Sequence, residues 1–163
     1  MSRVGGVPMR AVMTFHHILS TKKIASLHAW AAELGVLGII KVGHPGVLLL
    51  ADGRVEHAGV REYVRRVKRL PWQTCQLRAM DAVPAPPALD ALREVLAGAK
   101  STRAPLLQLD RLKAIAPVLR CADARGTSPP RGDSAHPPAR HAAAASGRDS
   151  PTWASFYSAA MRP

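Results

Sequence analysis

Two short apolar runs on either side of one turn constrain the fold of this chain more than any other feature. The runs are Gly38–Val42 and Val47–Ala51, and the turn 43–46 between them contains glycine and proline. Apolar runs of this length, bounded by turn residues, are typical of fully buried strands. Two such runs joined by a short turn predict a β-hairpin closed around His44-Pro45.

A helix, and beyond it another strand, are expected on each side of the hairpin. Apolar residues recur at the three- and four-residue spacing of a buried helical stripe, and Ser20 or Thr21, Gly35 and Pro71 supply start and stop signals. The expected elements are a strand over 11–18, a helix over 21–34, the hairpin, a helix over 54–70 and a strand over 74–80. This order predicts an α+β fold of the ferredoxin-like type, β-α-β-β-α-β, in which an antiparallel sheet carries two helices on one face.

Alternation along the two outer strands predicts which residues face the helices. Successive strand side chains point to opposite faces, so the adjacent His16 and His17 are expected to point apart rather than to chelate a metal. In the last strand, the alternation assigns Cys75, Leu77 and Ala79 to the helices, and Gln76, Arg78 and Met80 to an open face. Cys75 is expected to be a buried, inert thiol. Cys75 and Cys121 have no CxxC spacing, which argues against a disulfide scaffold or a zinc site.

Positive charge is the clearest functional signal in the sequence. The net charge of +12 favours a polyanionic partner, either nucleic acid or an anionic membrane surface. The second expected helix concentrates cations at positions that repel one another by about 0.2–0.5 kcal/mol per pair, an arrangement that stability alone would not favour. Basic residues in the first turn of the first helix suit an anion site as well. The candidate nucleic-acid-binding residues are Lys22, Lys23, Arg61, Arg65, Arg66, Lys68, Arg69 and Arg78.

Several short motifs occur in the same order as these elements. They are Phe15-His16-His17-Ile18, Trp30-Ala31, Gly43-x-Pro45-Gly46-Val47, Gly53 and Arg69-Leu70-x-Trp72. Over residues 11–83 the chain resembles the small nuclear ribonucleoprotein C-terminal domain family, which includes the C-terminal domains of RWD-domain-containing protein two and of pre-mRNA-processing factor three. The resemblance implies a ferredoxin-like fold without known catalysis. For the splicing branch of the family, it implies binding of spliceosomal small nuclear RNA and a role in mRNA splicing.

Composition divides the chain into four parts. Residues 1–10 are an N-terminal extension, 11–83 the ferredoxin-like domain, 84–120 a linker with short helices, and 121–163 a low-complexity tail. The linker helices are expected over 88–100 and 105–120, the second of them stopped by Pro117. The tail is expected to be disordered because it contains too few aliphatic residues to offset its chain entropy. Its aromatic cluster at 153–157 is assigned to this disorder, with a short docking motif as the alternative.

The sequence favours binding over catalysis. It contains no Gly-rich phosphate loop with its lysine, no HExxH and no GxSxG, and its carboxylates are few and not paired for acid–base chemistry. No catalytic residue, cofactor or metal is therefore predicted. The predicted function is a non-catalytic RNA-binding or ribonucleoprotein-assembly module that contacts the RNA backbone through a basic helix face. The alternative is a protein–protein adaptor for an acidic partner, without nucleic-acid binding.

The expected compartment is the nucleus or the cytoplasm. Two cysteines in separate regions suit a reducing environment, so secretion is not expected. No apolar run approaches the roughly 20 residues that a membrane-spanning helix needs, and a membrane partner is not expected either.

Overall fold

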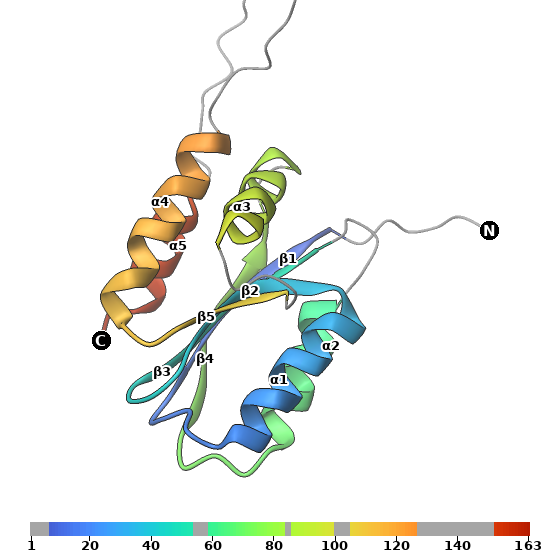
Figure 1. The fold of residues 1–163 in the computed structure, drawn as a ribbon, viewed down its shortest axis with the longest axis vertical. Coiled ribbons are helices and arrows are strands. Elements are labelled where there is room, and N and C mark those ends of the chain that lie inside the picture. The colour runs from blue at the N-terminus through green and yellow to red at the C-terminus, as the bar shows by residue number, and fades with distance from the viewer. Residues whose placement is uncertain (1–6, 54–58, 84–85, 100–104, 127–151) are drawn as a thin grey trace, which may run out of the picture.

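One five-stranded sheet lies between two layers of helices (Figure 1). The computed structural model describes residues 7–53, 59–83, 86–99, 105–126 and 152–163. Its elements are β1 (Met9–Phe15), α1 (Thr21–Leu34), β2 (Val36–Lys41), β3 (Gly46–Asp52), α2 (Gly59–Arg69), β4 (Cys75–Ala82), α3 (Pro86–Gly98), β5 (Leu106–Leu109), the 3-10 helix η1 (Leu112–Ala114), α4 (Ile115–Gly126) and α5 (Trp153–Ala160). Among the described helices, none is both long and apolar enough to cross a bilayer.

The first six elements have the predicted ferredoxin-like arrangement. The strand order is β4-β1-β3-β2-β5, with antiparallel pairing among the first four strands and parallel pairing between β2 and β5. Helices α1 and α2 cover one face of this sheet (Figure 1). The α+β prediction is therefore confirmed, and β5 adds a strand that it did not include.

The predicted hairpin is formed by β2 and β3, and its turn is held by Ile18, three residues after the end of β1. Ile18 donates its backbone N–H to Gly43 O at 2.9 Å and accepts from Gly43 N at 2.8 Å. A Cβ atom at Gly46 would lie 2.4 Å from Cγ1 of Ile18, so a larger residue there would displace this contact. Gly46 therefore reflects the close packing of Ile18 against the turn, whereas Gly43 reflects a backbone φ of 87°.

Helix α1 begins and ends where the sequence signals place its termini. The Ser20 hydroxyl accepts a hydrogen bond from Lys23 N at 3.4 Å, and Gly35 adopts the left-handed conformation with φ 65°. The predicted apolar stripe of α2 is buried from Val60 to Val67, while Leu70 is half-buried just after the helix. The hydroxyl of Tyr63 donates to Leu27 O of α1 at 3.0 Å. Burial raises the pKa of Tyr63. The two helices are thus joined to each other as well as to the sheet.

A buried carboxylate connects three of these elements. Asp52, at the end of β3, accepts hydrogen bonds from Met9 N of β1 at 2.8 Å and from Val60 N of α2 at 2.7 Å. Val60 lies in the first turn of its helix, where backbone N–H groups have no partner within the helix. Asp52 therefore satisfies an otherwise unpaired amide and fixes where α2 leaves the sheet.

Strand β4 departs from the simple alternation predicted for it. The register between β1 and β4 shifts after Val12, so that Ala79 lies opposite Val12 while Leu77 lies opposite Met13. The β-bulge places Arg78 as the extra residue between them. Cys75 and Leu77 pack toward α1 and α2 as predicted, whereas Ala79 packs in the core of the other face. The predicted facing of Ala79 is therefore wrong.

Helices α3, α4 and α5 cover the second face of the sheet, so most of the predicted open face is closed (Figure 1). On the edge strand β4, Gln76, Arg78 and Met80 are exposed, as the alternation predicts. The prediction for 88–100 matches α3, but the helix expected over 105–120 is wrong at its start, where β5 forms. Pro117 lies in the first turn of α4 rather than at a helix end. Proline is tolerated there because first-turn N–H groups make no bond within the helix.

Helix α5 corrects the prediction that all of 121–163 is disordered; the stretch 127–151 lies outside the described residues. Trp153 is 1% exposed, and Phe156, Tyr157 and Ala160 are also buried. The backbone N–H groups of Trp153 and Ala154 donate to the Asp123 carboxylate of α4 at 2.8 and 3.0 Å. On the sheet, the Arg10 guanidinium lies 4.1 Å from the centroid of the Phe156 ring. Long-range contacts therefore hold a segment whose local composition predicts disorder.

Replacing Trp153 with alanine tests this docking. The indole is fully buried and donates from Nε1 to Ala88 O at 3.0 Å. Trp153→Ala is expected to lower the free energy of unfolding by about 3–5 kcal/mol, as measured by urea denaturation followed by circular dichroism. Ser158→Ala, at an exposed position of the same helix, should leave the midpoint nearly unchanged. Equal midpoints for Trp153→Ala and the parent chain would contradict the docked position of α5.

Candidate nucleic-acid interface

One end of the sheet collects the ends of four strands and the loops that follow or precede them. The register pairs Phe15, the last residue of β1, with Gly46 and Cys75, the first residues of β3 and β4, and it pairs Lys41 at the end of β2 with Val47. Helix α1 follows β1 and helix α2 precedes β4, so the first turn of α1 and the last turn of α2 lie at this end. We call it the basic end, and it comprises Lys22, Lys23, Lys41, His44, Lys68, Arg69, Arg111 and Lys113.

The helical part of the basic end surrounds Trp72. Lys23 donates its Nζ to Pro71 O, and Nζ also lies 4.5 Å from the centroid of the Trp72 ring. The indole N–H of Trp72 donates to Val67 O of α2 at 2.8 Å, which links the start of α1 to the end of α2. Lys22, Lys68 and Arg69 are exposed beside it. These contacts bring together cations that are more than forty positions apart in the sequence.

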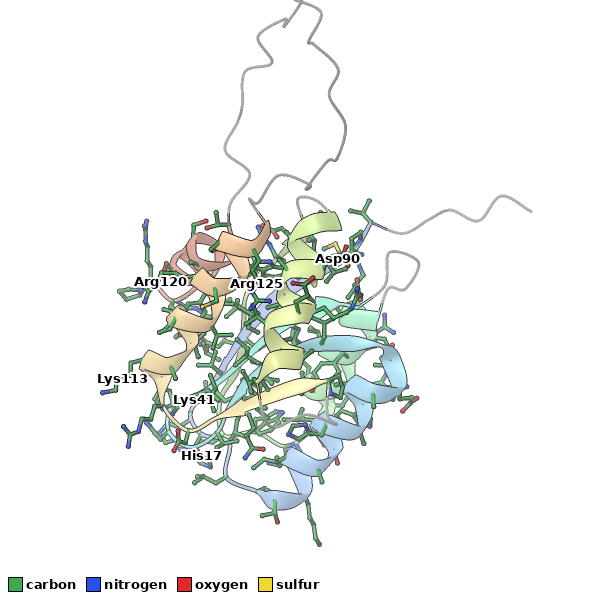
Figure 2. The ribbon with its side chains drawn as sticks, turned by 45° about the horizontal axis from the view of Figure 1, so that its top comes forward. His17, Lys41, Asp90, Lys113, Arg120 and Arg125 are labelled. Atoms are coloured by element: carbon green, nitrogen blue, oxygen red, sulfur yellow. The ribbon has the colours of Figure 1, made fainter. Side chains whose placement is uncertain are left out.

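An open pocket of about 630 Å³ forms the sheet-edge part of the basic end. It lies between the β2–β3 turn and the segment after β5, and it is lined by Lys41, His44, Pro45, Asp110, Arg111, Leu112 and Lys113. Lys41 is only 4% exposed, and its Nζ donates to Pro45 O at 2.7 Å. Figure 2 shows Lys41 and Lys113 on the same side of the molecule as His17.

Carboxylates are distributed away from this end. In the described ranges, Glu33, Asp52, Glu62 and Asp81 lie at the opposite ends of their helices and strands. Asp90 is on α3, far from Lys41 in Figure 2. Asp110 is the carboxylate that the described residues place at the basic end. Within the part of the chain that the structure describes, the charge is therefore distributed asymmetrically, with cations concentrated at one end of the sheet.

Two of the predicted binding residues are paired with carboxylates instead. Arg66 donates to both carboxylate oxygens of Glu33 at 2.9 and 3.0 Å and to Glu62 at 3.2 Å, and Arg65 also pairs with Glu62. The hydrogen bond from Arg66 lowers the pKa of Glu33, and the same pairing raises the pKa of Arg66. Bidentate Arg–carboxylate pairing leaves little of the charge for a ligand. Arg65 and Arg66 are thus less suited to phosphate contact than the sequence suggests.

The remaining predicted residues divide between the basic end and other places. Lys22, Lys23, Lys68 and Arg69 lie at the basic end, whereas Arg61 is exposed in the first turn of α2, toward the opposite end. Arg78 donates its Nε to Ala160 O at 2.9 Å and another N–H to Arg162 O. Ala160 is the last residue of α5, where carbonyl groups have no partner within the helix, and Arg162 lies two residues beyond it. Arg78 is exposed, but these hydrogen bonds commit its guanidinium to fastening the C-terminal segment to the sheet.

The adjacent histidines are closer together than predicted. Nδ1 of His16 and Nδ1 of His17 lie 2.8 Å apart, and the His16 and His44 ring centroids are 4.6 Å apart. The prediction that the first two point apart is wrong because β1 ends at Phe15, so strand alternation does not apply to them. Among the described residues, no group of three or more His, Cys, Asp or Glu side chains has metal-binding geometry.

Sequence reasoning did not single out the pocket cations Lys41, Arg111 and Lys113. One signal was available, since Lys41 is the only charged residue in the apolar run Gly38–Val42. Arg111 and Lys113 lie in the stretch that was assigned to a helix, and only the β5 pairing brings them next to the β2–β3 turn. No protein family, curated protein or solved structure was found to match the chain.

The two thiols should differ in reactivity. Cys75 lies at the basic end and is partly buried, and burial raises its pKa while nearby Lys68 lowers it by less. Cys121 is exposed on α4. A raised pKa means less thiolate at a given pH, so a disulfide reagent at pH 8 should modify Cys121 first and Cys75 in a slower phase. Cys121→Ser should remove the fast phase and Cys75→Ser the slow phase, and equal rates for both thiols would contradict the assignment.

Proposed function

We propose that this domain is a non-catalytic RNA-binding or ribonucleoprotein-assembly module that contacts the RNA backbone through its basic end. The observation that carries the proposal is the convergence of cations from four separate segments around one end of the sheet, with Asp110 as the described carboxylate among them. Such a concentration of positive charge attracts phosphate groups irrespective of base sequence. The exposed Lys22, Lys68 and Arg69 are the residues best placed for backbone contact.

The covered sheet determines the mode of binding. Domains that read single-stranded RNA on a sheet stack bases on aromatic side chains of an open face. Here α3, α4 and α5 occupy the face opposite α1 and α2, and the aromatic rings of α5 are turned into the core. The proposed mode is therefore contact with the phosphate backbone or with duplex shape, without base-specific reading by the sheet.

The resemblance to the small nuclear ribonucleoprotein C-terminal domain family supports an RNA partner. The motif Gly43-x-Pro45-Gly46 lies in the turn that forms part of the pocket, and Arg69-Leu70-x-Trp72 lies at the helical part of the basic end. The resembling motifs thus coincide with the proposed interface. A spliceosomal small nuclear RNA is the ligand that this resemblance suggests, in the nucleus or the cytoplasm.

A second candidate function is binding to an acidic protein. Leu19, between β1 and α1, is 64% exposed, and Leu112, at the pocket, is 38% exposed. Exposed apolar side chains beside a basic surface are more useful in a protein interface than in backbone contact with RNA. An adaptor of this kind would use the same cations to pair with carboxylates of its partner.

Salt dependence distinguishes the two functions. For single-stranded RNA, log affinity should fall with log salt concentration by about 0.7 for each phosphate neutralised. The double variant Lys68→Gln, Arg69→Gln is expected to reduce this slope by about 1.4, because it removes two such contacts. Fluorescence anisotropy of a labelled oligonucleotide, titrated at several potassium chloride concentrations, measures the slope. The melting temperature should stay close to that of the parent chain because both side chains are exposed.

A matched control removes two cations elsewhere. Arg61→Gln, Arg120→Gln changes the net charge by the same amount at exposed positions outside the basic end. This control should leave the slope nearly unchanged. Equal effects of both double variants would show that overall charge, and not the basic end, governs affinity. Absence of RNA binding at low salt, together with binding of an acidic polypeptide, would replace the RNA function by the adaptor.

A further inference from the structure

Lys41, one of the residues that line the pocket, is a buried cation without a carboxylate partner among its described contacts. Lys41 is 96% buried, and Pro45 O, at 2.7 Å from its Nζ, is the acceptor in its described contacts. A lysine ammonium has three N–H donors, and a carbonyl occupies one of them. Burial of a charge is costly unless an opposite charge compensates it. The remaining donors of Lys41 therefore suit an anion that enters the pocket.

The rim of the pocket adds further donors for such an anion. Arg111 and Lys113 follow β5 and are exposed, and His44 is exposed on the opposite side, in the β2–β3 turn. Asp110 also lines the pocket, so three permanent cations face one carboxylate. The lining is thus suited to a ligand with more than one negative charge. Arg111 offers the planar donor pair that binds two oxygens of one phosphate.

We propose that this pocket binds a terminal phosphate of a nucleotide, either on a free nucleoside monophosphate or at the 5′ end of an RNA strand. A phosphate monoester carries a charge of about −1.5 to −2 at pH 7 and presents three unsubstituted oxygens. An internal phosphodiester carries one charge, and its strand must continue in both directions. A single buried cation with others at the rim matches the monoester. The strand-end form of the ligand rests on the proposed RNA function, whereas the phosphate site does not.

The size and the remaining lining of the pocket favour a nucleotide over inorganic phosphate. A volume of about 630 Å³ is within the usual range for small-molecule sites, about 300–1,000 Å³. The imidazole of His44 offers a flat ring for stacking, and Leu112 is a partly exposed apolar neighbour. These two side chains supply contacts for a base or a ribose beyond the phosphate.

Two oligonucleotides that differ only at the 5′ end test this site in the full chain. A short single-stranded RNA with a 5′ phosphate is expected to bind at least about tenfold more tightly than the same strand with a 5′ hydroxyl, as expected for added charge-assisted hydrogen bonds. A nucleoside monophosphate should bind alone, as measured by calorimetry, and should compete with the phosphorylated strand. The corresponding nucleoside should do neither.

Variants assign the preference to the pocket. Arg111→Gln is expected to weaken binding of the phosphorylated strand by about tenfold or more and that of the 5′-hydroxyl strand by less, so that the preference for the 5′ phosphate is lost. Arg111 is exposed, so this variant should fold normally. Lys41→Met should act in the same direction, and its melting curve will separate loss of binding from loss of folding. Arg120→Gln removes an equal charge on α4 and should retain the preference; Figure 2 labels its position.

The outcomes separate this site from the proposed function. Equal affinity for the two strands, with no binding of the nucleoside monophosphate, would overturn the pocket site and leave salt-dependent backbone binding intact. Binding of the nucleoside monophosphate without affinity for either strand would support the pocket and remove the RNA function. Retention of the full preference in Arg111→Gln and in a folded Lys41→Met would also overturn the proposal.

Discussion

The buried carboxylate of Asp52 is the contact on which the arrangement of this domain depends. It accepts hydrogen bonds from Met9 N and Val60 N, so one side chain ties the start of β1 and the first turn of α2 to the end of β3. Without it, two backbone N–H groups would lose their partners, at a cost of about 1–3 kcal/mol for each that stayed buried. Because α2 begins at this end, its last turn must reach the other end of the sheet. The position of Lys68 and Arg69 at the basic end therefore follows from a contact at the far end of their helix.

The spacing and the residue preferences within single elements were enough to predict most of the helices and strands of the ferredoxin-like part. The hairpin, the stripes of α1 and α2, and the caps at Ser20 and Gly35 all follow from spacing and from residue preferences within one element. Strand β5 and helix α5 do not. Strand β5 is four residues long and gains its stability from parallel pairing with β2. Helix α5 needs partners from β1 and α4, so composition averaged over 121–163 could not reveal it.

The candidate site shows the same division between local and long-range information. The density of arginines on α2 is visible in the sequence, but the pairing of Arg66 with Glu33 depends on how α1 lies against α2. Proximity of Lys41 to Arg111 likewise depends on strand order, which brings together segments about seventy residues apart. A charged residue inside an apolar run is the kind of local inconsistency that points to function, and Lys41 fits that description. The sequence therefore predicted that the candidate interface is positively charged, whereas the position of that charge depends on the packing of α1 against α2 and on the strand order.

The hydrogen bonds between Asp123 and the start of α5 have a consequence for how the chain tolerates change. They hold Trp153 N at 2.8 Å from a carboxylate in the last turn of α4, so the start of α5 lies beside the end of α4. Loss of the Asp123 carboxylate would leave two backbone N–H groups of α5 without this acceptor and would loosen the docking of the buried Trp153. One side chain on α4 thereby couples the folding of the last helix to that of the helix before it.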